Sequence, residues 1–241
     1  MAEIGIISQA RMTSTRLPGK VLKEIQGHSL LHYHLTRLKW SKLPVVIATT
    51  VNAGDDPIVE ACESEGVPFF RGDEADVLSR YHGAAQKFGF QNIVRVTSDC
   101  PLIDGHLISE AARTYLNLKT PWLYLSNCLE RSYPRGFDFE IFSFEMLQTA
   151  FEKAREPAER EHVSPYFYQN KHGRTKLHSL TRQPDLSRFR LTVDEPDDFK
   201  LMEQLILKYK CEGKSQAEIC QVLLDHPELA QINSHVEQKK L

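Results

Sequence analysis

A basic loop near the start of the chain has the residue types needed to bind a polyphosphate. Residues 8–20 read SQARMTSTRLPGK and hold three cations, Arg11, Arg16 and Lys20, among several hydroxyl side chains. Backbone N–H groups of such a loop can surround phosphate oxygens, while arginine supplies forked donors and lysine a mobile point charge. The spacing matches neither the Walker A loop nor the G-x-G-x-x-G fingerprint. A solvated surface loop is the alternative, but a position directly after an apolar strand favours binding.

Two aspartates stand where predicted strands end. Asp99 follows the fourth apolar run of the chain, and Asp194 follows the last one. Carboxylates at the carboxyl edge of a parallel sheet can hold Mg²⁺ against phosphate oxygens. Each aspartate could instead cap the helix that follows it, since acids favour a helix N-terminus. We predict metal binding for this pair, and capping alone for Asp197 and Asp198.

The elements that must position these residues alternate between strand and helix. Strands are predicted at residues 4–7, 45–48, 67–70 and 93–96. Helical stripes are predicted at residues 30–38, 58–62 and 77–88. This alternation is typical of an α/β fold, here a Rossmann-like, mainly parallel sheet with helices on both faces. Ligands of such sheets bind at the carboxyl ends of the strands.

The second half of the chain is less regular. Further strands are predicted at residues 122–127, 137–142, 177–181 and 189–193. Further helices are predicted at residues 144–154, 158–171, 196–206, 215–224 and 229–238. We divide the chain into a main domain at residues 1–212 and a helical C-terminal tail at 213–241. A small inserted β region at about 120–145 is expected to serve acceptor binding or dimerisation.

Composition excludes several classes of protein. The 241 residues carry a formal net charge of −2, which offers no bulk positive charge to a nucleic acid. The five cysteines form no C-x-x-C pair, so we expect free thiols in a reducing cytoplasm. We expect neither a signal peptide nor a membrane span, since no apolar stretch approaches roughly 20 residues. The predicted protein is cytoplasmic and binds neither membrane nor nucleic acid.

The basic loop resembles the opening motif of a known enzyme family. Residues 10–20 fit A-R-x-x-S-T-R-L-P-G-K, which is similar to the motif of the cytidylyltransferases that make CMP-KDO and, more loosely, CMP-sialic acid. The resemblance is strongest to the SpsF-type branch of spore-coat polysaccharide synthesis. It implies that Ala10 and Arg11 lie near the base and ribose of CTP. It also implies that Arg16 and Lys20 contact the triphosphate.

Three more segments of the chain resemble family segments that bind the metal or lie beside the nucleotide base. Asp99 and Asp194 fall in segments that resemble the family motifs G-D-x-P-L-I and V-D-x-P-x-D, which implies that both are Mg²⁺ ligands. Ser98, which directly precedes Asp99, is predicted to bind the nucleotide. Residues that follow Arg71 also resemble the SpsF-type branch, where this segment lies beside the base. Arg71 therefore joins the predicted nucleotide-binding residues, with Arg80 as an alternative.

Two segments resemble acceptor-binding parts of the same branch. Residues 134–140 fit P-x-G-x-D-x-E, in which strand alternation puts both acids on one face, and residues 159–163 read E-R-E-H-V. The resemblance implies acceptor-binding roles for Asp138, Glu140, Arg160, Glu161 and His162. In this interpretation Arg160 binds an acceptor carboxylate. A half-exposed strand and a helix surface with ordinary ion pairs remain the alternatives.

The predicted activity is Mg²⁺-dependent transfer of CMP from CTP to a sugar or sugar-acid acceptor, with release of pyrophosphate. Lys20, Arg11 and Asp99 are the predicted catalytic residues, in a homodimer that serves surface polysaccharide or glycoconjugate biosynthesis. Two alternatives stay open: a nucleotide-sugar-dependent glycosyltransferase of Rossmann-like fold, and a catalytically silent nucleotide-binding protein. The first usually needs a D-x-D metal motif, which this sequence lacks. Spacing alone does not exclude UTP or ATP.

Overall fold

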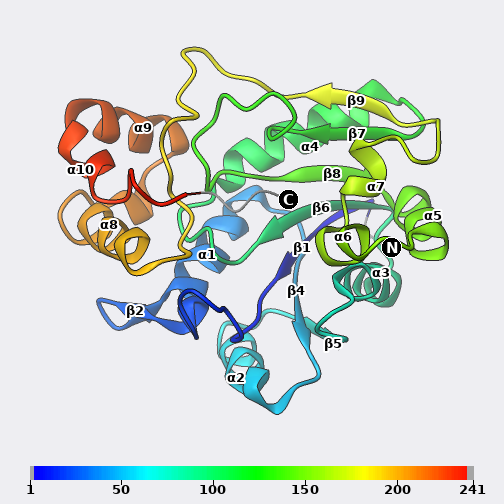
Figure 1. The fold of residues 1–241 in the computed structure, drawn as a ribbon, viewed down its shortest axis with the longest axis horizontal. Helices are drawn as coiled ribbons and strands as arrows, with labels where there is room; N and C mark the ends of the chain where they lie inside the picture. The colour runs from blue at the N-terminus through cyan, green and yellow to red at the C-terminus, as the bar shows by residue number, and fades with distance from the viewer. Residues whose placement is uncertain (1–2, 238–241) are drawn as a thin grey trace.

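A seven-stranded sheet forms the centre of the molecule (Figure 1). The structure, a computed structural model, describes residues 3–237. In sheet order the strands are β5 (Phe69–Gly72), β4 (Val45–Thr50), β1 (Ile4–Gln9), β6 (Asn92–Thr97), β8 (Glu140–Ser143), β7 (Leu123–Ser126) and β9 (Lys176–Ser179). Buried aliphatic residues fill the central strands, because both faces of the sheet are covered.

The order of the strands creates a crevice beside β1. The strands β5, β4, β1 and β6 are parallel, β8 runs antiparallel to both of its neighbours, and β9 is parallel to β7. From β1 the chain moves outward to β4 and β5, then returns to pair β6 with the other side of β1. At such a switch point the loops that follow neighbouring strands diverge and leave room for a ligand.

Helices cover both faces of the sheet. One face carries α1 (Leu30–Leu38), α2 (Asp56–Ser64) and α4 (Gly105–Leu118), and the other carries α3 (Val77–Phe88), α5 (Phe144–Lys153), α6 (Pro157–His162) and α7 (Pro165–Tyr168). Consecutive side chains of a strand point to opposite faces. Ile6 accordingly packs in the first of these cores and Ile7 in the second.

The C-terminal helices α8 (Pro196–Leu207), α9 (Gln216–Asp225) and α10 (Pro227–Gln231) form a third apolar cluster at one end of the sheet (Figure 1). Leu17 and Leu30 from the N-terminal part contribute to that cluster. The buried guanidinium of Arg37 in α1 also donates to three backbone carbonyls at residues 211–214. The smaller elements are η1 (Lys20–Leu22), β2 (Glu24–Ile25), β3 (His28–Ser29), η2 (Lys39–Ser41), η3 (Ala53–Asp55) and η4 (Cys211–Gly213). No helix within residues 3–237 is long and apolar enough to cross a membrane.

The predicted fold class is confirmed, but one predicted strand is wrong. Residues 189–193 make only an isolated bridge, between Arg190 and Arg135. Val193 N instead donates to Asp99 O at 2.8 Å, so the segment crosses over the end of β6. Asp194 therefore reaches the crevice from an irregular segment that precedes α8. The predicted strand at 137–142 is also shorter than expected and starts at Glu140.

Two helix predictions also change. The single helix expected at 158–171 is divided into α6 and α7, because Val163 has a φ of +66° and Pro165 has no N–H to donate. The last helix, expected at 229–238, begins at Pro227 and ends at Gln231, and Gln238 lies outside the described residues. Helix α4 was not predicted, although residues 107–115 have apolar positions at helical spacing.

Candidate nucleotide and metal site

A cleft lies at the switch point, where β1 and β6 end. The loop after β1 forms one wall, the end of β6 forms the floor, and residues of α3, α6 and the segment before α8 complete it. Seven residues predicted to bind the nucleotide or the metal line this cleft, which we call the nucleotide pocket: Ala10, Arg11, Arg16, Lys20, Ser98, Asp99 and Asp194. Glu161, His162 and Arg80 line it as well.

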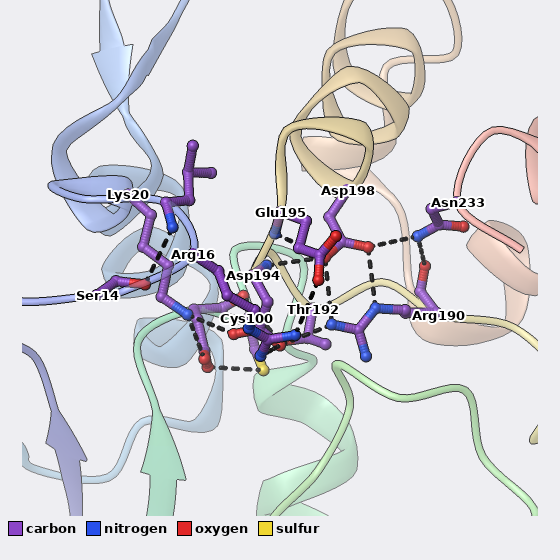
Figure 2. Close-up of polar contacts among 12 residues, drawn as sticks. Ser14, Arg16, Lys20, Cys100, Arg190, Thr192, Asp194, Glu195, Asp198 and Asn233 are labelled. Atoms are coloured by element: carbon purple, nitrogen blue, oxygen red, sulfur yellow. Dashed lines mark hydrogen bonds and ion pairs between the residues drawn. The ribbon is translucent and has the colours of Figure 1, made fainter. Parts of the chain in front are cut away.

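Lys20 stands between the two predicted metal ligands. Its Nζ lies 2.8 Å from Asp99 Oδ2 and 2.7 Å from Asp194 Oδ1. Figure 2 shows Lys20 and Arg16 approaching this cluster from the loop, with Asp194 on the side of α8. Residues separated by 79 and 174 positions in sequence thus share a single ion cluster.

The charges of the cluster stabilise one another. Burial by itself would lower the pKa of Lys20, but Asp99 and Asp194 outweigh it, and the pKa lies above its ordinary value of 10.5. Burial would raise the pKa of Asp99, yet the Lys20 ammonium and the Thr97 hydroxyl hold it below its ordinary value of 3.8. At neutral pH the lysine is therefore charged and Asp99 is ionised.

A second layer of contacts fixes Asp194. Its Oδ2 accepts from Arg190 at 2.6 Å and lies 3.1 Å from the Arg16 guanidinium. Arg190 is itself held by the buried Asp198, at 2.9 Å, and Asn233 donates to Asp198 at 2.8 Å (Figure 2). The Asp198 carboxylate also accepts from the backbone N–H groups of Asp194 and Glu195, so it caps α8 as predicted, but its ion pair with Arg190 goes beyond the capping alone that the sequence predicts. Asp197 pairs instead with Lys200 and His235. The tail thereby supports the pocket through Asn233.

Acidic side chains also anchor the basic loop. Asp55, which is 1% exposed, accepts from Met12 N at 2.7 Å. The Met12 carbonyl accepts in turn from Gly19 N at 2.9 Å, and Gly19 closes this turn with a φ of +66° that favours glycine. Arg11 lies 3.8 Å from Glu74. These contacts fix the loop that presents Arg16 and Lys20.

One buried imidazole holds both neighbours of Asp99. His34 Nδ1 lies 2.8 Å from the Cys100 carbonyl, which can only accept, so Nδ1 carries the proton. Burial lowers the pKa of His34 to about 4, so the ring is neutral and Nε2 accepts from Ser8 Oγ at 2.8 Å. Ser8 then accepts from Ser98 Oγ, also at 2.8 Å. The residues before and after Asp99 are thus tied to one side chain of α1.

We predict that His34→Leu lowers the free energy of unfolding by about 2–5 kcal/mol above pH 6.5, because the Ser8 hydroxyl and the Cys100 carbonyl lose a buried partner. The deficit should shrink as the pH falls towards 4. In that range the unfolded wild type takes up a proton on His34 that the folded protein does not bind, so the wild type alone loses stability. Urea unfolding at several pH values measures both effects. A deficit that is constant between pH 7 and 4 would contradict the lowered pKa, and adding Ser8→Ala should recover part of the loss.

The Asp99 and Asp194 carboxylates fit a magnesium ion. Mg²⁺ prefers oxygen ligands and is commonly held by one or two carboxylates together with substrate phosphates. The Lys20 ammonium contacts both carboxylates at once, which demonstrates that a single cationic centre can reach the pair. The donor set and its spacing therefore suit the ion that the sequence predicts.

A second cleft, of about 490 Å³, adjoins the nucleotide pocket and shares His162 with it. Glu140 lines this cleft and forms an ion pair with Arg95 at 2.8 Å. Arg131 also lines it and binds Asp138 through two hydrogen bonds of 2.6 and 3.1 Å. We call it the acceptor cleft.

Arg135 gives the acceptor cleft its unmatched positive charge. Within residues 3–237 its guanidinium forms no ion pair, unlike those of Arg95 and Arg131. Partial burial and the neighbouring charges of Arg131 and Arg190 lower the pKa of Arg135, while the Asp138 carboxylate acts in the opposite direction. A guanidinium near two other guanidinium groups, with no ion pair of its own among the described residues, is suited to an anionic ligand.

Three predicted binding residues line neither cleft: Arg71, Arg160 and Asp138, the last of which pairs with Arg131. Arg160 pairs with Asp76, the N-cap of α3, and donates to the Phe151 carbonyl at 2.9 Å. Arg71 pairs with Asp56 at 2.7 Å and donates to the carbonyls of Thr50, the last residue of β4, and Asn52. The guanidinium groups of both arginines are thus engaged in holding local structure.

Several residues of the site were not found from sequence. His34 and Asp55 are buried, and their partners come from distant strands and loops. Arg190 had a usable signal, because a charged residue inside an otherwise apolar run must find a partner when it is buried. Asn233 belongs to the tail, for which the sequence predicted only a helix.

A mainly parallel α/β sheet whose switch point carries a basic loop and two converging carboxylates is the arrangement that a nucleotidyltransferase requires. The profile of the cytidylyltransferase family matches residues 4–239, and the chain belongs to that family.

Individual relatives agree with this assignment. The uncharacterized protein MJ1063 of Methanocaldococcus jannaschii is 39% identical over 99% of this chain and 97% of its own length. The spore coat polysaccharide biosynthesis protein SpsF of Bacillus subtilis is 29% identical over 86% of this chain and 88% of its own. The solved structure of a cytidylyltransferase from Leptospira borgpetersenii superimposes with a TM-score of 0.91 at 33% identity and covers both chains completely.

Proposed function

We propose that this protein transfers CMP from CTP to a sugar acid and releases pyrophosphate. The observation that carries the proposal is the convergence of Lys20, Asp99 and Asp194 on the floor of one pocket. Membership of the cytidylyltransferase family supports CTP as the donor. Similarity to a protein of spore coat polysaccharide biosynthesis supports a role in surface polysaccharide or glycoconjugate synthesis. Dependence on Mg²⁺, a homodimer and a cytoplasmic location stay predictions.

The basic loop would bind the triphosphate. Lys20 and Arg16 pair with carboxylates, and the phosphates of an entering nucleotide offer them a second set of anionic partners. Arg11, whose side chain is 43% exposed, can turn towards the same ligand. Mg²⁺ held by Asp99 and Asp194 would neutralise phosphate charge. Lys20 then exchanges its contact with two carboxylates for a contact with phosphate.

The chemistry is an in-line displacement at the α-phosphorus. The acceptor oxygen forms the new bond to phosphorus, the bond to the bridging oxygen of the β-phosphate breaks so that pyrophosphate leaves, and the proton of the acceptor hydroxyl passes to solvent. The side chains contribute positioning and charge stabilisation, and no covalent intermediate on the protein is needed. His162, which lines both clefts, stands where the two substrates must meet.

The acceptor cleft favours an acidic sugar. Arg95 and Arg131 are neutralised by Glu140 and Asp138, which leaves the charge of Arg135 for the substrate. Arg135 therefore takes the role that the sequence analysis gave to Arg160. Glu140, held by Ser164 at 2.8 Å as well as by Arg95, remains available as an acceptor of sugar hydroxyl groups.

A screen of pyrophosphate release tests the function. CTP, UTP, ATP and GTP are each incubated with acidic, amino and neutral sugars in the presence of Mg²⁺. We expect release with CTP and one or more sugar acids. Sugar transfer from a nucleotide-sugar without pyrophosphate would indicate the glycosyltransferase alternative. No CTP-dependent release across a broad panel would instead indicate a catalytically silent binding protein.

With the acceptor from that screen, we predict that Arg135→Gln raises the acceptor KM about 10- to 100-fold, because one charge-assisted contact is lost. The KM for CTP should stay within about twofold, since Arg135 does not line the nucleotide pocket. Arg188→Gln is the matched control, because Arg188 stacks on Phe189 outside the acceptor cleft. Equal increases in both KM values would argue against an acceptor contact.

A further inference from the structure

The C-terminal tail reaches the carboxylates of the nucleotide pocket through one buried amide. Asn233, just beyond the end of α10, is 3% exposed. Its Nδ2 donates to Asp198 Oδ1 at 2.8 Å and to the Arg190 carbonyl at 3.1 Å, so both amide protons have an acceptor. Arg190 Nη2 donates in turn to Asp194 Oδ2 at 2.6 Å. Figure 2 shows these contacts leading from Asn233 to Asp194.

The Asp198 carboxylate at the centre of these contacts is fully buried, so its oxygens depend on donors from the protein. Oδ2 accepts from the backbone N–H groups of Asp194 and Glu195, at 2.9 and 3.0 Å, and Oδ1 accepts from Arg190 Nε at 2.9 Å. Asn233 supplies a further donor to Oδ1. Because an amide is neutral, it stabilises the carboxylate without adding a cation that would compete with Arg190. The charge of Arg190 is therefore shared between Asp198 and Asp194.

The two oxygens of Asp194 have different partners. Oδ2 accepts from Arg190 and lies 3.1 Å from the Arg16 guanidinium, whereas Oδ1 contacts Lys20 Nζ at 2.7 Å. The same ammonium lies 2.8 Å from Asp99, so Oδ1 is the oxygen that shares a cationic partner with Asp99. Contacts to Oδ2 restrict rotation of the carboxylate, and a ligand that is already oriented loses less conformational freedom when it binds a cation.

We propose that Asn233 is a positioning residue for the divalent cation: it holds Asp198 and Arg190 so that Asp194 presents Oδ1 to the metal. The inference rests on the proposed function, because it assumes that Mg²⁺ binds at Asp99 and Asp194. A tail that only covered the apolar side of α8 would need no buried amide here, since side chains such as Leu229 supply that packing.

Calorimetric titration of Mg²⁺ into the whole chain, saturated with α,β-methylene-CTP, tests the proposal. This analogue cannot be cleaved between its α- and β-phosphorus atoms, so binding is measured without turnover. Asn233→Ala should raise the apparent dissociation constant of Mg²⁺ about 10- to 100-fold, as expected when a metal ligand loses its supporting contacts. Affinity for the analogue without Mg²⁺ should change less than about twofold, because the arginines and lysine of the loop remain. In turnover, the Mg²⁺ concentration that gives half the maximal rate should rise in parallel, with the acceptor KM within about twofold.

Leu229→Ala is the matched control. Leu229 is 4% exposed in the same tail and packs in the apolar cluster, but its side chain has no hydrogen bond to lose. The control should lower the thermal midpoint at least as much as Asn233→Ala, because it leaves a cavity, yet change the Mg²⁺ constant less than about twofold. All variants are compared well below their thermal midpoints, and Asn233→Ser takes the place of Asn233→Ala if the latter does not fold.

A double-mutant cycle with Asp194→Asn shows whether the effect passes through Asp194. Asp99 and the phosphates of the analogue still bind the ion in that background, and adding Asn233→Ala should raise the Mg²⁺ constant by less than about twofold. A full effect in that background would overturn the proposal. So would equal increases in Asn233→Ala and Leu229→Ala, which would mean that Asn233 only docks the tail, or an unchanged constant in Asn233→Ala. The proposed function would stand in each of these cases. A wild type that binds the analogue but no Mg²⁺ would overturn the proposal and the metal site, whereas one that binds no analogue would also overturn the proposed function.

Discussion

Asp99→Asn is expected to reduce CTP-dependent pyrophosphate release by roughly 10³-fold or more while the protein stays folded. The substitution keeps the size of the side chain and an oxygen that can still accept from Lys20 or Thr97. It removes the negative charge that a divalent cation requires. Steady-state release of pyrophosphate and the thermal midpoint, measured on the same preparation, separate the loss of chemistry from a loss of fold.

Asp197→Asn is the matched control for this variant. Asp197 lies at the start of α8, close in sequence to Asp194, but its carboxylate faces Lys200 and His235 rather than the pocket. We expect its activity within about twofold of the wild type, as for an exposed ion pair. Near-normal turnover by Asp99→Asn would remove Asp99 from the metal site.

The sequence could predict the position of Asp99 because strand order and chemistry agree there. An apolar run followed by Thr-Ser-Asp places a carboxylate at the edge of a parallel sheet, whatever the neighbouring chain does. Lys20 could be predicted in the same way from the loop after β1. The contact of Lys20 Nζ with both Asp99 and Asp194 depends on the tertiary structure, since these partners are 79 and 174 residues away in sequence. The motif around Asp194 correctly predicts that this residue lines the pocket. The strand predicted before it, at residues 189–193, does not form.

The arginines show where sequence reasoning fails. Arg71, Arg80, Arg135 and Arg160 all lie in segments that resemble binding segments, and the sequence alone does not tell which guanidinium is already occupied. In the structure, carboxylates neutralise Arg71 and Arg160, while Arg80 and Arg135 line the two clefts and form no ion pair with any residue between positions 3 and 237. The difference depends on Asp56 and Asp76, whose proximity is decided by packing. A motif therefore identifies the neighbourhood of a site, and the ion pairs select the residues within it.

Lys20→Met should lower kcat/KM by roughly 10²–10³-fold and, in addition, create a response to Mg²⁺ alone. The turnover falls because the ammonium no longer stabilises phosphate charge. The folded state remains accessible, since Arg190 and Arg16 still hold Asp194 and Thr97 still donates to Asp99. With Lys20 removed, two carboxylates face each other without a cation between them. Mg²⁺ should then bind without nucleotide and stabilise the variant by about 1.4 kcal/mol at ten times its dissociation constant.

The wild type should show a much smaller stabilisation by free Mg²⁺, because the Lys20 ammonium already occupies the position between Asp99 and Asp194. Thermal unfolding across a Mg²⁺ titration, with no nucleotide present, measures the difference. Lys23→Met controls for the loss of a nearby charge, since Lys23 stacks over Phe199 and does not line the pocket. Equal stabilisation of the wild type and Lys20→Met would mean that the lysine and the metal do not compete for one site. If neither responds, the two carboxylates do not bind a divalent cation by themselves, and the exchange of Lys20 from carboxylate to phosphate would lose its basis.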